Sequence, residues 1–192
     1  MKENKTDLRV VKTKKILYTT LVSLMQEYTF EEIKVSDICT RALINRSTFY
    51  AHYTDKYDLL SSCINDIKDS LTKELEKNKN ISNSKEYYIE MIRLFLDYVD
   101  ENKEIFVAIM NNNQNSIMVD MAYDVINKDI VKKLSKDEES TFIPSDIITK
   151  FYLGAVLNVG LEWLKNNQNA TKEELISYLD YLIPADINKK SN

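Results

Sequence analysis

The chain has 192 residues, of which 44% are hydrophobic and 29% charged, a balance typical of globular proteins. It holds only two glycines, which excludes a P-loop and a dinucleotide fingerprint, because both repeat glycine at fixed spacing. The net charge of −4 is unevenly placed: residues 1–60 carry 10 basic and 8 acidic side chains, and residues 61–192 carry 16 and 22. A slightly basic head on an acidic body is a weak sign of a polyanion-binding end.

Histidine and cysteine usage excludes further classes of site. The chain has one histidine, His52, and two distant cysteines, Cys39 and Cys63, so we expect reduced core thiols and no metal site. No run of eighteen apolar residues occurs, and no signal-type apolar segment follows the basic N-terminus. No nucleophile and base are paired in a pattern that indicates catalysis. We therefore expect a cytoplasmic protein that is not an enzyme, spans no membrane and needs no cofactor.

Apolar residues recur every three or four positions along most of the chain, which predicts about nine helices and no strand. The first three helices are expected near residues 8–28, 35–42 and 46–53, with Asn45 capping the third. A long fourth helix is expected to begin at a Thr54 cap and to end before a polar loop at residues 78–84. The remaining helices are expected near residues 85–100, 103–110, 116–134 and 146–166, followed by one that the Thr171–Glu174 capping box opens and Pro184 ends.

Residues 35–60 carry the most informative pattern. Two short helices, a tight turn and a long following helix form the arrangement of a helix-turn-helix. The residues with the spacing to pack the two short helices together are Ile38, Ala42, Ile44 and Phe49. The outer face of the second short helix then presents Arg46, Ser47 and Tyr50, which suit a DNA major groove and its flanking phosphates.

This segment resembles the DNA-binding domain of TetR-type transcription regulators. The resemblance covers residues 8–62 and rests on residues 45–50, 52–53 and 55–60, together with the spacing of the apolar residues from Phe30 to Ile38. A weaker likeness relates residues 151–164 to the penultimate helix, through which small regulators of this family dimerise. The resemblance implies an N-terminal DNA-binding domain over residues 1–56 and a C-terminal ligand-binding and dimerisation domain over residues 57–192.

The family's residue roles carry over to matching positions of this chain. The resemblance implies that Arg46 and Ser47 face base edges. The residues implied to touch the DNA backbone are Ser36, Thr48, Tyr50, His52 and Lys56. Two positions depart from the family pattern. Leu43 stands where glycine is usual, which predicts either a different turn backbone or strain, and Lys34 stands where serine or threonine often caps the helix.

The C-terminal helices are rich in aromatic and methionine side chains, most of which we expect in the core. In this family a subset of them lines a ligand cavity, and the side chains that we expect there are Tyr88, Met91, Phe95, Met110, Met118, Met121, Phe151 and Tyr152. Residues 146–166 are apolar nearly all round and contain both glycines, which predicts burial against the body and against a partner chain rather than inside a monomer. The expected dimer contacts are Gly154, Leu157, Leu161, Leu175, Leu179 and Leu182.

The residues predict an all-α homodimer that binds double-stranded DNA. The resemblance implies that a small-molecule effector controls this binding, and that repression is the commoner outcome while activation is the alternative. Two recognition helices about 34–36 Å apart would bind a near-palindromic operator. A ligand would favour a conformer in which the fourth helix tilts and this spacing no longer fits. The alternative from another class is a helical protein-interaction module, in which the acidic body binds a protein partner.

Overall fold

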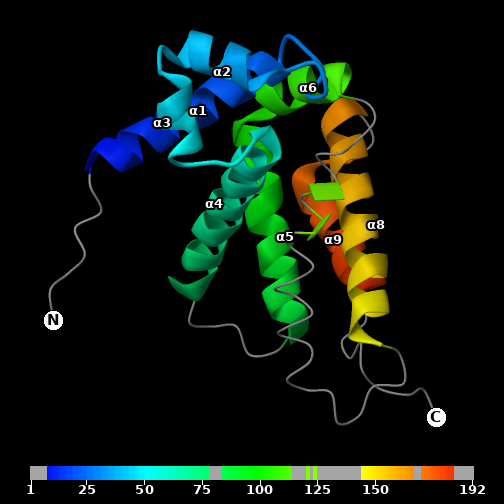
Figure 1. Cartoon of the computed structure of the whole chain (residues 1–192). Coiled ribbons are helices and arrows are strands. Elements are labelled where there is room, and N and C mark those ends of the chain that lie inside the picture. Colours follow the sequence, from blue (N-terminus) through cyan, green and yellow to red (C-terminus); the bar gives the residue numbers. More distant parts are fainter. Residues whose placement is uncertain are drawn as a thin grey trace, which may run out of the picture. The chain divides into compact units, whose positions relative to one another are not determined.

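The computed structural model describes residues 8–77, 84–113, 120–121, 123–124, 144–166 and 170–183. The helices within them are α1 (Leu8–Met25), α2 (Val35–Ala42), α3 (Arg46–Tyr50), α4 (Lys56–Lys77), α5 (Ser84–Glu101), α6 (Lys103–Asn112), α8 (Ser145–Asn166) and α9 (Lys172–Leu182) (Figure 1). No strand occurs in this part of the chain, so the expected all-α class is confirmed there. The helix expected over residues 116–134 lies almost entirely outside the described residues.

The chain packs as two compact units. The first unit comprises residues 1–64 and 104–115, and the second comprises residues 65–103 and 116–192. α4 passes from the first unit to the second between Ile64 and Asn65, whereas nearly all of α6 packs with the N-terminal helices. The functional boundary expected after residue 56 stays a prediction. No described helix combines the length and the apolar character needed to cross a membrane.

The first unit is built on the packing of α2 against α1 and α3. Ile38 and Phe49 have no exposed surface and Ala42 is buried, as expected of residues that pack between α2 and α3. Ile44 is only half-buried. Outside this core, the Arg41 guanidinium donates to both carboxylate oxygens of Glu27, at 2.6 and 2.7 Å, and so ties the end of α2 to the segment after α1.

The ends of the N-terminal helices differ in detail from the sequence expectations. α4 is capped by Asp55 rather than Thr54, because one oxygen of Asp55 accepts hydrogen bonds from the amides of Tyr57 and Asp58, each at 2.8 Å. Thr54 instead donates its own amide to Asp58. Asn45 stands at the N-cap position of α3, but its side chain makes no capping hydrogen bond. The first turn of α2 is held by Asp37, which accepts the Lys34 amide at 2.9 Å and compensates for the missing hydroxyl cap.

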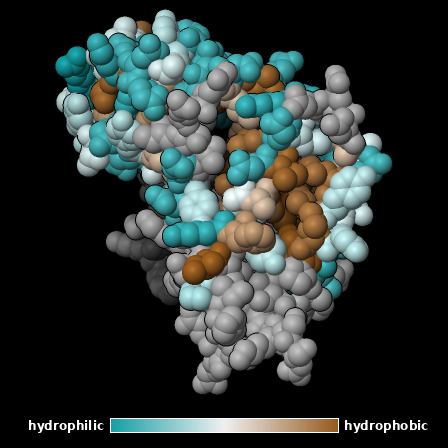
Figure 2. All heavy atoms as spheres, turned by 90° about the vertical axis from the view of Figure 1, so that its right-hand side faces the viewer, coloured by the Kyte–Doolittle hydropathy of each residue, from teal (hydrophilic) through white to brown (hydrophobic). Residues whose placement is uncertain are grey.

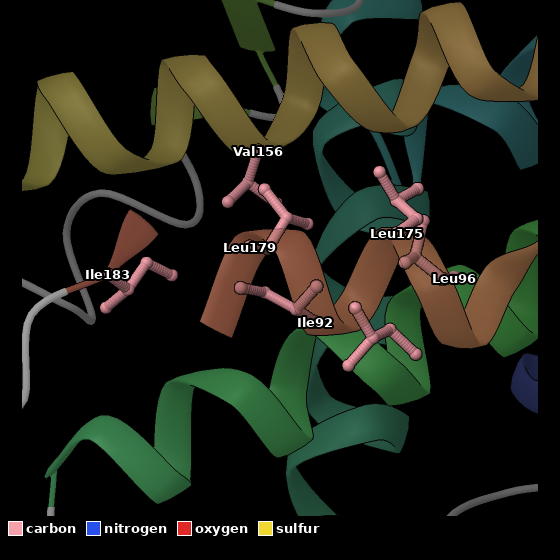
Figure 3. Packing of buried hydrophobic residues seen from close by; sticks show 7 residues of the cluster. Ile92, Leu96, Val156, Leu175, Leu179 and Ile183 are labelled. Atoms are coloured by element: carbon pink, nitrogen blue, oxygen red, sulfur yellow. The ribbon is translucent and has the colours of Figure 1, made fainter. Parts of the chain in front are cut away.

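The core of the second unit lies where α5, α8 and α9 meet. Its buried residues are Ile92, Leu96, Val156, Leu175, Ile176, Leu179 and Ile183 (Figure 3). α8 approaches α5 at Gly160, since a Cβ atom there would lie 3.4 Å from Leu96. Around Gly154, by contrast, a Cβ would meet nothing within 4 Å. The capping box of α9 is confirmed, with Thr171 donating its amide to Glu174 at 2.7 Å and accepting the Glu174 amide at 3.2 Å.

Truncating Leu96, whose side chain has no exposed surface, should lower the free energy of unfolding by about 2–5 kcal/mol, because Leu96→Ala leaves a cavity between α5 and α8. Urea unfolding followed by circular dichroism measures this loss. Leu8→Ala is the matched control, because Leu8 is largely exposed and its truncation should change stability by about 0.5 kcal/mol or less. Equal losses in the two variants would contradict the packing described for the second unit.

Candidate nucleic-acid interface

α3 is a five-residue helix that one buried aromatic side chain fixes in place. Phe49 is fully buried and contacts the rings of Tyr50 and Tyr53, with centroid distances of 5.5 and 6.0 Å. On the other side, Arg46 and Ser47 are exposed and Tyr50 keeps 56% of its surface in solvent. The helix therefore presents a guanidinium, a hydroxyl and a phenol outward, which is the chemistry that base edges and phosphates accept.

The other residues expected to touch DNA lie around this helix. Ser36 is in the first turn of α2, Thr48 is on α3 and His52 follows α3, and all three are half-buried. Their contacts with DNA stay predictions. Cys39, on the buried side of α2, has its thiol pKa raised by burial, although the Arg46 guanidinium acts in the opposite direction. This thiol therefore stays protonated at neutral pH, in agreement with a core role.

Lys56 does not have the arrangement expected of a phosphate contact. Its ammonium donates to the carbonyl oxygens of Phe30, Glu31 and Ile33, at 2.7, 2.8 and 2.8 Å. The ammonium also lies 4.8 Å from the centroid of the Phe30 ring. Burial lowers the pKa of Lys56, and nearby Glu31 opposes that effect. An ammonium has three donors and the chain uses all three, so Lys56 holds residues 30–33 of the connection between α1 and α2. Its contact with a DNA phosphate stays a prediction.

The same connection is held from another side by two asparagines at the end of α6. The Asn113 side chain accepts the Phe30 amide at 2.6 Å and donates to the Met25 carbonyl at 3.2 Å. Asn112 donates to the Gln26 carbonyl. The sequence predicts that this helix ends near residue 110, but α6 runs to Asn112, and Asn112 and the following Asn113 bind the connection. Contacts between residues more than 80 positions apart leave no trace in local periodicity, which is why the sequence does not reveal them.

Leu43, in the turn between α2 and α3, adopts the left-handed conformation that the family position normally gives to glycine. Its φ and ψ are 56° and 40°, and among the described residues it alone combines a side chain with a positive φ. Its amide donates to Thr40 and the Ile44 amide donates to Cys39, the pattern of a Schellman helix end. Of the two alternatives, strain is therefore the outcome, at a cost of roughly 1–2 kcal/mol.

The residues expected to line a ligand pocket are spread over both units. Tyr88, Met91 and Phe95 are half-buried on α5, Tyr152 is half-buried on α8, and Met121 is half-buried. Met110 is half-buried on α6 in the first unit, and Met118 lies outside the described residues. Phe151 is 69% exposed on α8, which does not fit a side chain that lines a closed pocket. For the others the pocket stays a prediction.

Half of the expected dimer contacts are corrected by burial. Leu157, Leu175 and Leu179 are buried within their own chain, and the two leucines of α9 pack in the core of the second unit, so they do not present a surface to a partner. Leu182 is exposed, and Gly154 and Leu161 are half-buried. The large apolar side chains that α8 and α9 expose are Ile147, Phe151, Val159, Tyr178, Tyr181 and Leu182. We call these six residues the exposed apolar face, and Figure 2 shows hydrophobic side chains gathered on the side where α8 lies.

Comparisons with known proteins relate both units to transcription regulators. A family model described as the transcriptional regulator C-terminal region matches residues 86–185. The chain is 21% identical to the transposon Tn10 TetC protein of Escherichia coli over 158 residues, which cover 77% of this chain and 80% of that protein. It is 30% identical over 105 residues to the dhaKLM operon transcriptional activator DhaS of Lactococcus lactis, covering 54% of this chain and 51% of DhaS.

A solved structure extends the comparison to the whole fold. The TetR transcriptional regulator from Streptococcus agalactiae 2603V is 23% identical and superposes with a TM-score of 0.62. The superposition covers 95% of this chain and 97% of that one. At this identity the likeness supports the fold alone, and the assignment to transcription regulators rests on the family model that matches residues 86–185.

Replacing Lys56 by methionine should lower the free energy of unfolding by about 2–3 kcal/mol, because three carbonyl groups lose a charged donor. Lys34→Met is the matched control, because Lys34 is exposed and should change stability little. Urea unfolding measures both variants. The opposite result would support a phosphate contact instead. In that case Lys56→Met would leave the free energy of unfolding unchanged, and the slope of log DNA affinity against log salt concentration would fall by about 1.

Proposed function

The chain belongs to the TetR family of transcription regulators, and we propose that it acts in the cytoplasm as a homodimeric repressor that a small molecule releases from a near-palindromic operator. TetR-family regulators bind DNA and act as dimers, so the protein is a DNA-binding transcription regulator rather than only a protein-interaction module. No enzymatic activity is part of the proposal.

The observation that carries the proposal is the exposed face of α3. Phe49 anchors the helix from beneath, while Arg46 and Ser47 are exposed and Tyr50, whose ring contacts Phe49, keeps 56% of its surface in solvent. A guanidinium at the start of a recognition helix suits bidentate hydrogen bonding to guanine O6 and N7. Ser47 and Tyr50 supply hydroxyl groups that suit a neighbouring base edge and a phosphate. This combination favours sequence-specific binding in the major groove.

A route for effector control follows from the chain connections between the units. α4 continues from the first unit into the second, and α6 follows α5 with a single residue, Asn102, between them. α6 in turn binds the α1–α2 connection through Asn112 and Asn113. A ligand that favours a different conformer of the second unit would therefore bias the positions of α4 and α6, and through them the spacing of the two recognition helices. A coupling of about 1–3 kcal/mol is usual for such control.

The exposed apolar face is the surface that we assign to a second copy of the chain. Six large apolar side chains are exposed on these two helices, and TetR-family regulators act as dimers. Gly154 lies on the same helix with open space where a Cβ would stand, which leaves room for close approach by another backbone. Two copies of α8 and α9 would then form a four-helix interface with two-fold symmetry.

Selection of duplexes from a random library by the purified protein, at roughly 150 mM salt, tests the proposal. A two-fold symmetric motif is expected, and its absence both with and without candidate effectors would contradict the function. A reporter gene placed behind the selected site then gives the sign of regulation. That measurement matters because DhaS, a relative, is named as an activator.

Arg46→Ala should weaken binding to the selected site by about 1–3 kcal/mol and relax preference at one base pair in each half-site. Fluorescence anisotropy with the selected duplex and with a scrambled duplex measures both effects. The matched control is Arg93→Ala, because Arg93 lies on α5 in the second unit and should not affect DNA binding. Unchanged affinity of the Arg46 variant at physiological salt would remove α3 as the recognition helix.

Phe151→Asp combined with Tyr181→Asp should weaken dimerisation about tenfold or more, because both side chains are largely exposed and a charge there would be desolvated by a partner. Analytical ultracentrifugation measures the dimer dissociation constant. The helical content should be unchanged, since neither side chain belongs to the core. Leu8→Asp, on the exposed start of α1, is the control, and an equally strong effect of that change would speak against the assigned face.

A further inference from the structure

We propose that Leu43 contacts DNA directly and reads the 5-methyl group of a thymine in the major groove, an assignment that rests on the proposed function. Leu43 exposes 92% of its surface, more than any other large apolar side chain among the described residues. It also holds a backbone conformation that glycine adopts freely and leucine does not. Both the exposed apolar surface and the left-handed backbone are unfavourable for a leucine, and no contact within the described part of the chain offsets either.

The turn itself does not require a leucine. The two hydrogen bonds that end α2, from the Leu43 amide to Thr40 and from the Ile44 amide to Cys39, use backbone atoms alone. A glycine at position 43 would make both bonds without strain. The side chain also contributes nothing to the core, where Ile38, Ala42 and Phe49 already join α2 to α3. Single exposed leucines are ordinary on helices, as Leu8 shows, but there the backbone is relaxed.

The position of Leu43 indicates what the side chain contacts. It lies two residues before Asn45, which is the N-cap of α3, and three before Arg46. The N-terminal residues of a recognition helix are the ones that reach base edges, so the turn leading into that helix approaches the same groove. Leu43, Asn45, Arg46 and Ser47 are all exposed, and they give this stretch one apolar group beside three polar ones.

The major groove offers one apolar group to such a side chain. The thymine 5-methyl is the hydrophobic feature of a base edge, and small and medium apolar side chains contact it. Arg46 would supply hydrogen bonds to a guanine, and Leu43 would add an apolar contact with the methyl group of a neighbouring thymine. Burying about one methyl group against the leucine should be worth about fourfold in affinity per half-site.

The test uses the full chain, two variants and the duplex selected by the wild type from a random library. Leu43→Gly removes the side chain and relieves the backbone strain, whereas Leu43→Met keeps an apolar side chain as the matched control. Each symmetric pair of thymines in the duplex is replaced in turn by deoxyuridine, which lacks only the 5-methyl group. Fluorescence anisotropy gives the affinity of each protein for each duplex, and thermal unfolding gives the stability of the variants.

We expect the wild type and Leu43→Met to lose about fourfold in affinity per half-site when one particular thymine pair becomes deoxyuridine. Leu43→Gly should bind the unmodified duplex about fourfold more weakly per half-site and should lose nothing further at that pair. Its melting temperature should not fall, and a rise of roughly 2–4 °C is expected from the relieved strain. Weaker binding by a variant that is no less stable separates a DNA contact from a structural role.

Three results would overturn the inference. Leu43→Gly could bind the unmodified duplex as tightly as the wild type, or no thymine pair could prove sensitive in the wild type. The same deoxyuridine penalty could also persist in Leu43→Gly, which would assign the methyl contact to another side chain. Failure of the wild type to select any duplex is a different outcome, because it would contradict the proposed function itself and this inference with it.

Discussion

The first unit depends on satisfying the polar backbone of the connection between α1 and α2. Residues 26–34 are not helical for most of their length, so their carbonyl and amide groups cannot all find partners within the segment. The Lys56 ammonium donates hydrogen bonds to three of those carbonyl groups. It also lies near the rings of Phe30 and Tyr57. The start of α2 is fixed by this arrangement, and the position of α3 follows from the core that α2 and α3 share.

The connection is also the point at which a distant part of the chain reaches the helix-turn-helix. α6 is separated from α1 by more than 75 residues, yet its last turn supplies Asn112 and Asn113 to the end of α1 and to Phe30. The first unit is therefore not a purely N-terminal segment. A change in the position of α6 would act directly on hydrogen bonds that hold the same loop as Lys56, so the proposed effector route ends at this loop.

The two units use their hydrophobic residues differently. In the first unit the buried residues close the core, and what remains exposed on α3 is mainly polar, apart from Tyr50 and the neighbouring Leu43. In the second unit α8 and α9 bury one set of leucines against α5 and expose another set of large apolar residues. A helix with two apolar sides is expected where one side faces the body and the other a second chain. Leu175 and Leu179 belong to the first set, and Leu157 is also buried within its own chain, so none of the three presents a surface to a partner.

The sequence by itself determined the helical class, the bounds of α2, the capping box of α9 and the helix-turn-helix with its outward Arg46, Ser47 and Tyr50. These features depend on periodicity, capping and turn chemistry, which act over a few neighbouring residues. Tertiary structure alone decided that Lys56 binds carbonyl groups, that α6 joins the N-terminal helices, and which leucines of α8 and α9 are buried. Each of these depends on contacts between residues far apart in the chain, and an apolar stripe does not specify which of its neighbours will cover it. Leu43 combines a local and a structural observation. Its position in the motif predicted either strain or a different turn backbone, and the left-handed backbone conformation in the structure shows that strain is the outcome.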